Sequence, residues 1–265
     1  MGNPMAERRV VTWSATGAVA TIMIDNPPHN VINREVRAGL SACLSAVEQD
    51  DSVRVLVIAA AGDRFFSPGG DISETPSKVT EEQARALTQE VSDQLLQIDE
   101  FPKPTICAVN GIAMGGGFVL AIACDLRVAA ENAIFGLPEQ KVAVFPGGGG
   151  TQRLPRLIGE GRAKELLFTA DPIDAHEAHR IGLVNRVVPV GRALCAAQEL
   201  AARIAEFSSP ILRATKVAVH ASRTADVAAG LALEVDSFAR LTQTEDVQEG
   251  YRAFIEKRKP RFQHR

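Results

Sequence analysis

The segment Met114-Gly115-Gly116-Gly117 joins an apolar run that predicts a strand, residues 105–110, to one that predicts a helix, residues 118–124. Glycines at the start of a helix leave backbone N–H groups unhindered, unpaired within the helix and aimed along the positive end of its dipole. A second pair, Gly69-Gly70, follows another predicted strand, residues 53–60. Two such turns can direct one N–H group each at the same carbonyl oxygen. The sequence therefore predicts an oxyanion-binding site, although glycine clusters at strand ends also form simple tight turns.

Around these turns, short runs rich in Val and Ile alternate with longer amphipathic segments. Strands are predicted at residues 19–25, 53–60 and 105–110. The helix predicted between the first two, residues 34–49, has apolar side chains at spacings of four, four and three: Val36, Leu40, Leu44 and Val47. The next helix has a similar face, with Leu87, Val91, Leu95 and Ile98. Such alternation predicts an α/β fold of βαβ units with largely parallel strands.

The pattern becomes helical after Gly150. Helices are predicted at residues 162–168, 174–180, 193–207, 211–221, 225–241 and 245–256. We therefore divide the chain into a catalytic core, residues 1–200, and a helical oligomerisation region, residues 201–265. The helical region carries Leu231, Val235 and Phe238, apolar side chains in excess of what one chain is expected to cover. This excess predicts an oligomer.

Composition limits the partners of the protein. The chain has 265 residues and a net charge of −3, and its 29 Lys and Arg residues are spread along it, so nucleic acid is not an expected partner. Four cysteines lie far apart without metal-binding spacing, and we expect them to be reduced core residues: Cys43, Cys107, Cys124 and Cys195. A polar amino terminus and the lack of a long apolar run predict a soluble, cytoplasmic protein without a membrane partner.

Glu139 is the candidate acid or base. It stands in Leu137-Pro138-Glu139, and the apolar side chains of Leu137, Val142, Val144 and Phe145 could desolvate it. Desolvation favours a protonated carboxyl and brings its proton affinity toward that of a working acid or base. The alternative is an ordinary helix-capping or surface carboxylate.

Other polar groups give weaker signals. The run Gly147 to Gly150 lacks the Lys-Ser/Thr pair of a phosphate-binding loop, and Thr151-Gln152-Arg153 follows it instead. His176 and His179 share a helix face but have no third ligand in the sequence, so no metal site is expected. His29 is expected to be exposed or to line a groove, and Ser67 lacks a nucleophile motif.

Several segments, in this order, resemble the crotonase (enoyl-CoA hydratase/isomerase) superfamily over residues 10–262. They are Asn26-Pro27-Pro28-His29-Asn30-Val31-Ile32-Asn33, Phe66-Ser67-Pro68-Gly69-Gly70-Asp71-Ile72, residues 109–117, Ala123-Cys124-Asp125, Phe135-Gly136-Leu137-Pro138-Glu139, residues 146–154 and residues 253–259. The resemblance implies a spiral of ββα turns with a carboxy-terminal helical trimerisation region, assembled as a trimer or a dimer of trimers.

The same resemblance implies an acyl-CoA substrate, with coenzyme A as part of the substrate and no separate cofactor. The thioester oxygen would accept hydrogen bonds from the N–H groups of Gly70 and Gly116. A CoA groove would be lined by Asn30, Val31, Ile32, Gly69, Asp71 and Ile72. Phe254 and Lys257 would reach a CoA bound to this subunit or to a neighbouring one.

One departure from the family pattern bears on the reaction. Hydratases of this family use two glutamates, and the second matches Glu139, but the first falls at Val119, a position expected to face the substrate. A single carboxylate can more readily move one proton between C2 and C4 of the acyl chain, which favours isomerisation of a 3-enoyl-CoA. Hydration of a 2-enoyl-CoA, decarboxylation, thioester hydrolysis and non-catalytic acyl-CoA binding are the alternatives. Pro68 and Ala143 also depart from the small residue or glycine common in the family.

Overall fold

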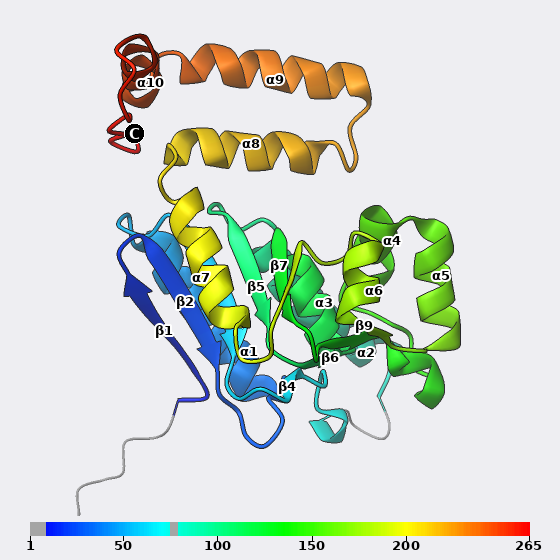
Figure 1. Cartoon of the computed structure of the whole chain (residues 1–265). Coiled ribbons are helices and arrows are strands. Elements are labelled where there is room, and N and C mark those ends of the chain that lie inside the picture. Colours follow the sequence, from blue (N-terminus) through cyan, green and yellow to red (C-terminus); the bar gives the residue numbers. More distant parts are fainter. Residues whose placement is uncertain (1–8, 75–78) are drawn as a thin grey trace, which may run out of the picture.

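The structure is a computed structural model that describes residues 9–74 and 79–265 (Figure 1). Within these residues, six strands form a large sheet in the order β1-β2-β3-β5-β7-β10. Their bounds are β1 Val11–Thr16, β2 Val19–Ile24, β3 Val55–Ala60, β5 Thr105–Val109, β7 Leu126–Ala130 and β10 Arg186–Val188. β1 pairs with β2 antiparallel, and every other neighbouring pair is parallel, as the sequence predicts.

A second sheet is built from shorter strands, in the order β4-β6-β8-β9. β4 (Phe65–Ser67), β6 (Ile112–Met114) and β8 (Ile134–Gly136) run parallel, and β9 (Ile173–Asp174) pairs with β8 antiparallel. These strands were not predicted from the sequence. Each has two or three residues, which is too short for an alternating pattern to be seen.

Each repeating unit therefore has two strands rather than one, which corrects the predicted βαβ unit to ββα. One unit consists of β3, β4 and α2 (Glu81–Asp99), and the next of β5, β6 and α3 (Gly116–Ala123). A third consists of β7, β8, the 3-10 helix η2 (Pro138–Val142) and α4 (Gly150–Ile158). Successive units give one strand to each sheet, so the chain winds as the spiral that the family resemblance implies.

The large sheet is covered on both faces. Leu56 and Ile58 of β3 belong to a core cluster with Val36, Leu40 and Leu44 of α1 (Arg34–Gln49). The alternate residues of β3, Val55 and Val57, belong to a second cluster with Ala197 and Ala201 of α7 (Ala193–Ile204). Because neighbouring strand residues point to opposite faces, one buried strand packs against both helices. α1 has its predicted bounds, and the Asn33 side chain accepts a hydrogen bond from the N–H of Val36 to cap it.

The remaining helices follow the core. α5 (Glu160–Thr169) and α6 (Ala175–Arg180) lie beside α4, and α8 (Ser209–Ala221), α9 (Val227–Leu241) and α10 (Glu245–Ile255) form a separate layer above the large sheet (Figure 1). α4 was not predicted from the sequence, because it begins with glycine and contains Pro155. The predicted boundary at residue 200 falls inside α7, whose Ala201 is buried against the sheet, so the separate layer starts at α8. The functional division of the chain remains a prediction.

Candidate active site

The two glycine turns lie at one edge of the small sheet. They were predicted to follow the long strands β3 and β5 directly, but they follow β4 and β6. These two strands are parallel neighbours, with Phe65 opposite Ile112 and Ser67 opposite Ala113. Glu139 follows β8, which is the next parallel neighbour of β6. Parallel strands end at the same edge of a sheet, so all three predicted catalytic segments meet there.

The two glycine turns approach each other closely, and at Gly69 they leave no room for a side chain. A Cβ atom on Gly69, whose φ is +111°, would lie 3.0 Å from the backbone nitrogen of Gly116. A Cβ on Gly116 would lie 3.4 Å from the nitrogen of Gly70, whereas a Cβ on Gly70 would point into open space. Neither the Gly70 nor the Gly116 N–H group donates a hydrogen bond to another described residue. Two adjacent free donors are the arrangement that an oxyanion site requires.

Local hydrogen bonds fix these turns. The N–H of Gly115 donates to the Gly136 carbonyl at 3.0 Å, which ties the α3 turn to the end of β8. The N–H of Gly69 donates to Oγ of Ser67 at 3.1 Å. Ser67 is fully buried, so its hydroxyl shapes the turn, a role that sequence analysis missed. Its place two residues before Gly69 was the available signal.

Glu139 extends toward the start of α3. A Cβ atom on Gly115 would lie 3.2 Å from Oε1 of Glu139, so the carboxylate lies beside the residue that precedes Gly116. Oε2 of Glu139 is buried and has no hydrogen-bond partner among the described residues. Burial raises the pKa of Glu139, while a backbone hydrogen bond opposes the shift. A half-buried carboxyl with one oxygen unpartnered can accept a proton from a ligand.

The residues around Glu139 only partly match the expected desolvating set. Leu137 is 1 % exposed and belongs to the core. Val142, Val144 and Phe145 are exposed in this chain, so that part of the prediction is wrong: Val142 is the last residue of η2, and Val144 and Phe145 follow it in an exposed segment. Ala143 ends η2 with a φ of +55°, a left-handed conformation that explains why glycine is common there in the family.

Val119 is part of the core wall behind the site. Its side chain is 2 % exposed. Cβ atoms added to Gly148 and Gly150 would lie 3.6 and 3.2 Å from its Cγ1 and Cγ2 atoms. Val119 therefore supplies an apolar surface and no acid or base.

The predicted CoA-groove residues divide into buried supports and exposed groups. Asn30 is buried with a φ of +59°, and its amide donates to the carbonyls of Ala61 and Phe65 at 2.9 and 3.1 Å. The N–H of Ile32 donates to the Gly69 carbonyl at 2.8 Å, which holds the glycine turn against this segment. Val31 lies between them and is half-buried.

Beyond Gly70, the carboxylate of Asp71 accepts hydrogen bonds from the N–H and hydroxyl of Ser73, which lower its pKa. Ile72 is 74 % exposed beside this turn. Phe254, at the end of α10, and Lys257, just after it, lie at the opposite end of the molecule from β4 and β6 (Figure 1). In this chain the two residues are therefore not brought to the glycine turns.

The remaining sequence candidates have structural roles. His29 is exposed and packs edge-on against Phe65, with ring centroids 4.7 Å apart. His179 bonds the Val184 carbonyl through Nδ1 at 2.9 Å, and residues 9–74 and 79–265 contain no group of three or more metal-ligating side chains. Cys43, Cys107 and Cys124 are buried free thiols, as predicted. Cys195 is only half-buried, contrary to expectation, because it lies on an outer face of α7 and donates to Glu199.

Comparison with known proteins identifies relatives along nearly the whole chain. The model of the family "Enoyl-CoA hydratase/isomerase" matches residues 14–265. A crotonyl-CoA hydratase of Syntrophomonas wolfei is 41 % identical over 247 residues, which cover 92 % of this chain and 94 % of that protein. A mouse methylglutaconyl-CoA hydratase is 38 % identical over 237 residues, which cover 88 % of this chain and 75 % of the relative.

Solved structures agree with this assignment. The crystal structure of an enoyl-CoA hydratase from Bacillus anthracis superposes with a TM-score of 0.91 at 37 % identity, covering 97 % of this chain and all of that chain. An enoyl-CoA hydratase subunit from Geobacillus kaustophilus gives a TM-score of 0.92 at 39 % identity, covering 98 % and 100 %. With its ββα spiral, paired glycine turns and matched length, the chain belongs to the enoyl-CoA hydratase/isomerase family of the crotonase superfamily, a family of enzymes that act on acyl-CoA thioesters.

Proposed function

We propose that this protein isomerises a 3-enoyl-CoA to the 2-enoyl-CoA, with Glu139 as its single acid/base and Gly70 and Gly116 as oxyanion donors. The observation that carries the proposal is the unpartnered Oε2 of Glu139 beside the glycine turns, together with a buried valine at position 119. One carboxylate suffices for a reaction that removes one proton and returns one proton.

In the proposed reaction, the thioester oxygen accepts hydrogen bonds from the N–H groups of Gly70 and Gly116. The Glu139 carboxylate removes a proton from C2, and the electron pair of that C–H bond passes into the conjugated system to form a dienolate. The two N–H groups stabilise the negative charge on the oxygen. The protonated Glu139 then delivers its proton to C4, which leaves a double bond between C2 and C3. No water is consumed and the carboxylate is regenerated.

The CoA portion would bind along the segment from Asn30 to Ile32 and the Gly69-to-Ile72 loop. The hydrogen bond from Ile32 to the Gly69 carbonyl supports this assignment, because it ties the proposed groove segment to the oxyanion turn. Phe254 and Lys257 would act on the CoA of a neighbouring subunit, since in one chain they lie away from the glycines. Assembly as a trimer or dimer of trimers is part of the proposal.

Hydration of a 2-enoyl-CoA is the second candidate, favoured by the names of the relatives, several of which are hydratases. It would require Glu139 to take a proton from water as the oxygen adds to C3, and C2 to receive a proton. Val119 offers no second acceptor to orient that water. Decarboxylation and thioester hydrolysis could use the same oxyanion site, and a non-catalytic acyl-CoA-binding protein would need no functional Glu139.

A paired assay tests the choice between isomerisation and hydration. We expect the unmodified protein to isomerise a 3-enoyl-CoA faster than it hydrates the 2-enoyl-CoA of the same chain length. Val119→Glu should raise hydration if the buried position accepts a charge, and Val119→Leu is the matched apolar control. Efficient hydration by the unmodified protein without isomerisation would overturn the isomerase assignment.

The location of the protein is proposed to be the cytoplasm. In the part of the chain that the structure describes, no helix has the length and apolar character needed to cross a bilayer.

A further inference from the structure

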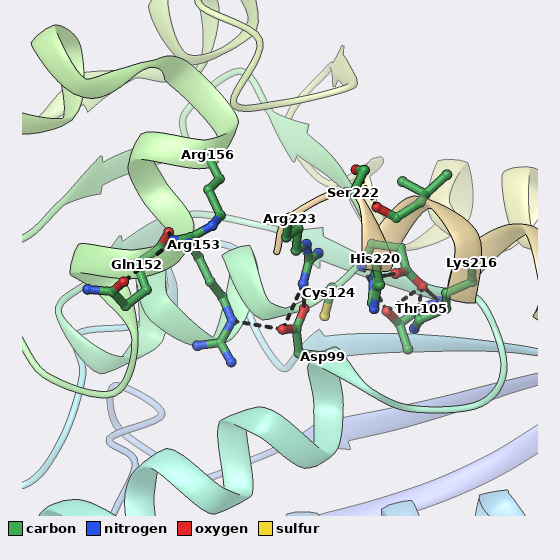
Figure 2. A network of polar contacts seen from close by, with 12 residues as sticks. Asp99, Thr105, Cys124, Gln152, Arg153, Arg156, Lys216, His220, Ser222 and Arg223 are labelled. Carbon is green, nitrogen blue, oxygen red and sulfur yellow. Dashed lines mark hydrogen bonds and ion pairs between the residues drawn. The ribbon is translucent and has the colours of Figure 1, made fainter. Parts of the chain in front are cut away.

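A wide cleft separates the core from α8, on the side of the molecule away from the two glycine turns. Its volume is about 1080 Å³, and residues of α2, α4 and α8 line it. Gly70, Gly116 and Glu139 are not among the lining residues. Polar side chains from different elements meet across it (Figure 2).

Asp99, at the end of α2, connects two arginines there. Nη1 of Arg223, which follows α8, donates to both carboxylate oxygens of Asp99 at 2.8 and 2.9 Å. Nε of Arg153, on α4, lies 3.4 Å from Oδ2 of the same carboxylate (Figure 2). The Asp99 and Arg153 side chains are 11 % and 13 % exposed, so water screens this pair weakly.

Arg153 also holds the turn that precedes its own helix. Its Nη1 donates to the Gly148 carbonyl at 2.9 Å. Gly149 has a φ of +91°, and a Cβ atom there would overlap Nη1 of Arg153. The glycine run at 147–150 therefore leaves room for this guanidinium.

The same turn forms the wall behind the proposed catalytic groups. Cβ atoms on Gly148 and Gly150 would contact Val119, and one on Gly150 would also lie 3.6 Å from Leu137. The chain runs from Glu139 to this turn through residues 140–146, and the Glu139 carbonyl accepts a hydrogen bond from the N–H of Val144. A shift of the turn would therefore move the loop that carries Glu139.

We propose that Arg153 is a positioning residue for the Glu139 loop and that Asp99 and Arg223 couple the placement of α8 to it. Arg223 orients the Asp99 carboxylate, the carboxylate orients Arg153, and Arg153 fixes the Gly148 carbonyl. The helical layer thereby acts on the catalytic edge through a chain of charged contacts. This role in turnover rests on the proposed function of Glu139.

A second anchor of α8 provides the matched control. Asp125 accepts a hydrogen bond from Nζ of Lys216 at 2.8 Å and lies 3.4 Å from Nε2 of His220. The hydroxyl of Thr105 also donates to Asp125 at 3.0 Å. Neither Lys216 nor His220 forms a hydrogen bond or ion pair with residues 146–153. Breaking this anchor removes one contact of α8 but leaves the contacts of Arg223 and Arg153 with Asp99 in place.

The test compares Arg223→Met with Lys216→Met in the full chain, using steady-state kinetics and amide hydrogen exchange. We expect Arg223→Met to lower kcat about 10- to 100-fold with little change in KM. Exchange should accelerate at the amides of Gly150 and Arg153, which bond to the Gly147 and Gly149 carbonyls. Lys216→Met should accelerate exchange in α8 and leave kcat and these two amides near their original values.

Arg153→Lys provides a second variant, because lysine keeps the charge but cannot contact Asp99 and the Gly148 carbonyl through a planar fork. It should reproduce the faster exchange at Gly150. Two results would overturn the coupling. The first is an exchange rate at Gly150 in Arg223→Met and Arg153→Lys that equals the rate in the unmodified protein. The second is an equal effect of Arg223→Met and Lys216→Met on kcat. The exchange measurement needs no substrate, so its outcome is separate from failure of the proposed reaction.

Discussion

Glu139 lies beside Gly115: a Cβ atom on Gly115 would lie 3.2 Å from Oε1 of the Glu139 carboxylate. Gly115 also has a φ of +50°. Gly115, which precedes the proposed oxyanion donor Gly116, therefore leaves room for the carboxylate of Glu139. Both groups occupy the same edge of the small sheet because β6 and β8 are parallel neighbours.

Gly115→Ala should lower kcat because the methyl group displaces the carboxylate. Gly17→Ala is the matched control: its φ is +58°, and nothing lies within 4 Å of a Cβ there. Each variant should lose roughly 1–3 kcal/mol of folding free energy through backbone strain. Thermal unfolding gives the fraction of folded protein, and kinetics give kcat. Only Gly115→Ala should lose more activity than its loss of folded protein explains. Equal kcat in both variants would show that a side chain at position 115 does not disturb the proposed catalytic groups.

Gly116→Pro should lower kcat by about 10²–10³ while acyl-CoA binding changes little, because proline removes one oxyanion donor. Gly116 is the first residue of α3, a position where proline suits a helix. Circular dichroism checks the fold, and calorimetry with a non-reactive acyl-CoA checks binding. A folded variant with most of its activity would mean that another group holds the carbonyl oxygen.

The pH dependence of the reaction should reflect Glu139. Burial raises the pKa of this carboxyl above its ordinary value of 4.5. The base must be ionised in the first step, so kcat/KM should fall as pH decreases through the raised pKa, with a midpoint above 4.5. This acid limb should be missing from the residual activity of Glu139→Gln. A midpoint below 4.5 would contradict the assignment.

The raised pKa of Glu139 also affects the stability of the fold. A carboxyl with a folded-state pKa above its unfolded value stabilises the fold at low pH, and this contribution is lost as pH rises through the raised pKa. At neutral pH the charged form is therefore unfavourable, and Glu139→Gln should have an equal or higher Tm. Glu131→Gln, an exposed site before β8, is the matched control and should change Tm little. A clearly lower Tm only for Glu139→Gln would indicate a structural carboxylate.

Oligomerisation should depend on the helical layer. Val235 and Phe238 on α9 are 68 % and 67 % exposed in one chain, a large apolar area to leave in water. We expect light scattering to give a mass of three or six copies. Val235→Asp should shift the protein toward monomers, whereas Ser14→Asp, on the exposed face of β1, should not. A monomeric unmodified protein would contradict the assembly.

The long helices and strands could be predicted because their apolar patterns extend over many residues. α1 shows about three turns of apolar spacing, and its predicted bounds agree with the structure. β3 and β5 were recognisable as continuous apolar runs because both faces of the large sheet are covered. The strands of the second sheet have at most three residues, so no pattern within them could be detected.

The sequence identified residues of the candidate site but not how they lie relative to one another. Glycine clusters and a carboxylate in an apolar segment drew attention to Gly70, Gly116 and Glu139. Their meeting depends on the pairing of β4, β6 and β8, a non-local property that spacing along the chain does not encode. The Asp99 link between Arg153 and Arg223 joins residues far apart in the sequence and had no local signal.

The most direct test of the central claim is the rate of 3-enoyl-CoA isomerisation by Glu139→Gln, beside its affinity for a non-reactive acyl-CoA. Gln is nearly isosteric with Glu but cannot carry the proton, so the rate should fall by about 10²–10⁴ with unchanged affinity. Turnover equal to that of the unmodified protein would contradict it, since Glu139 would then have no part in the chemistry.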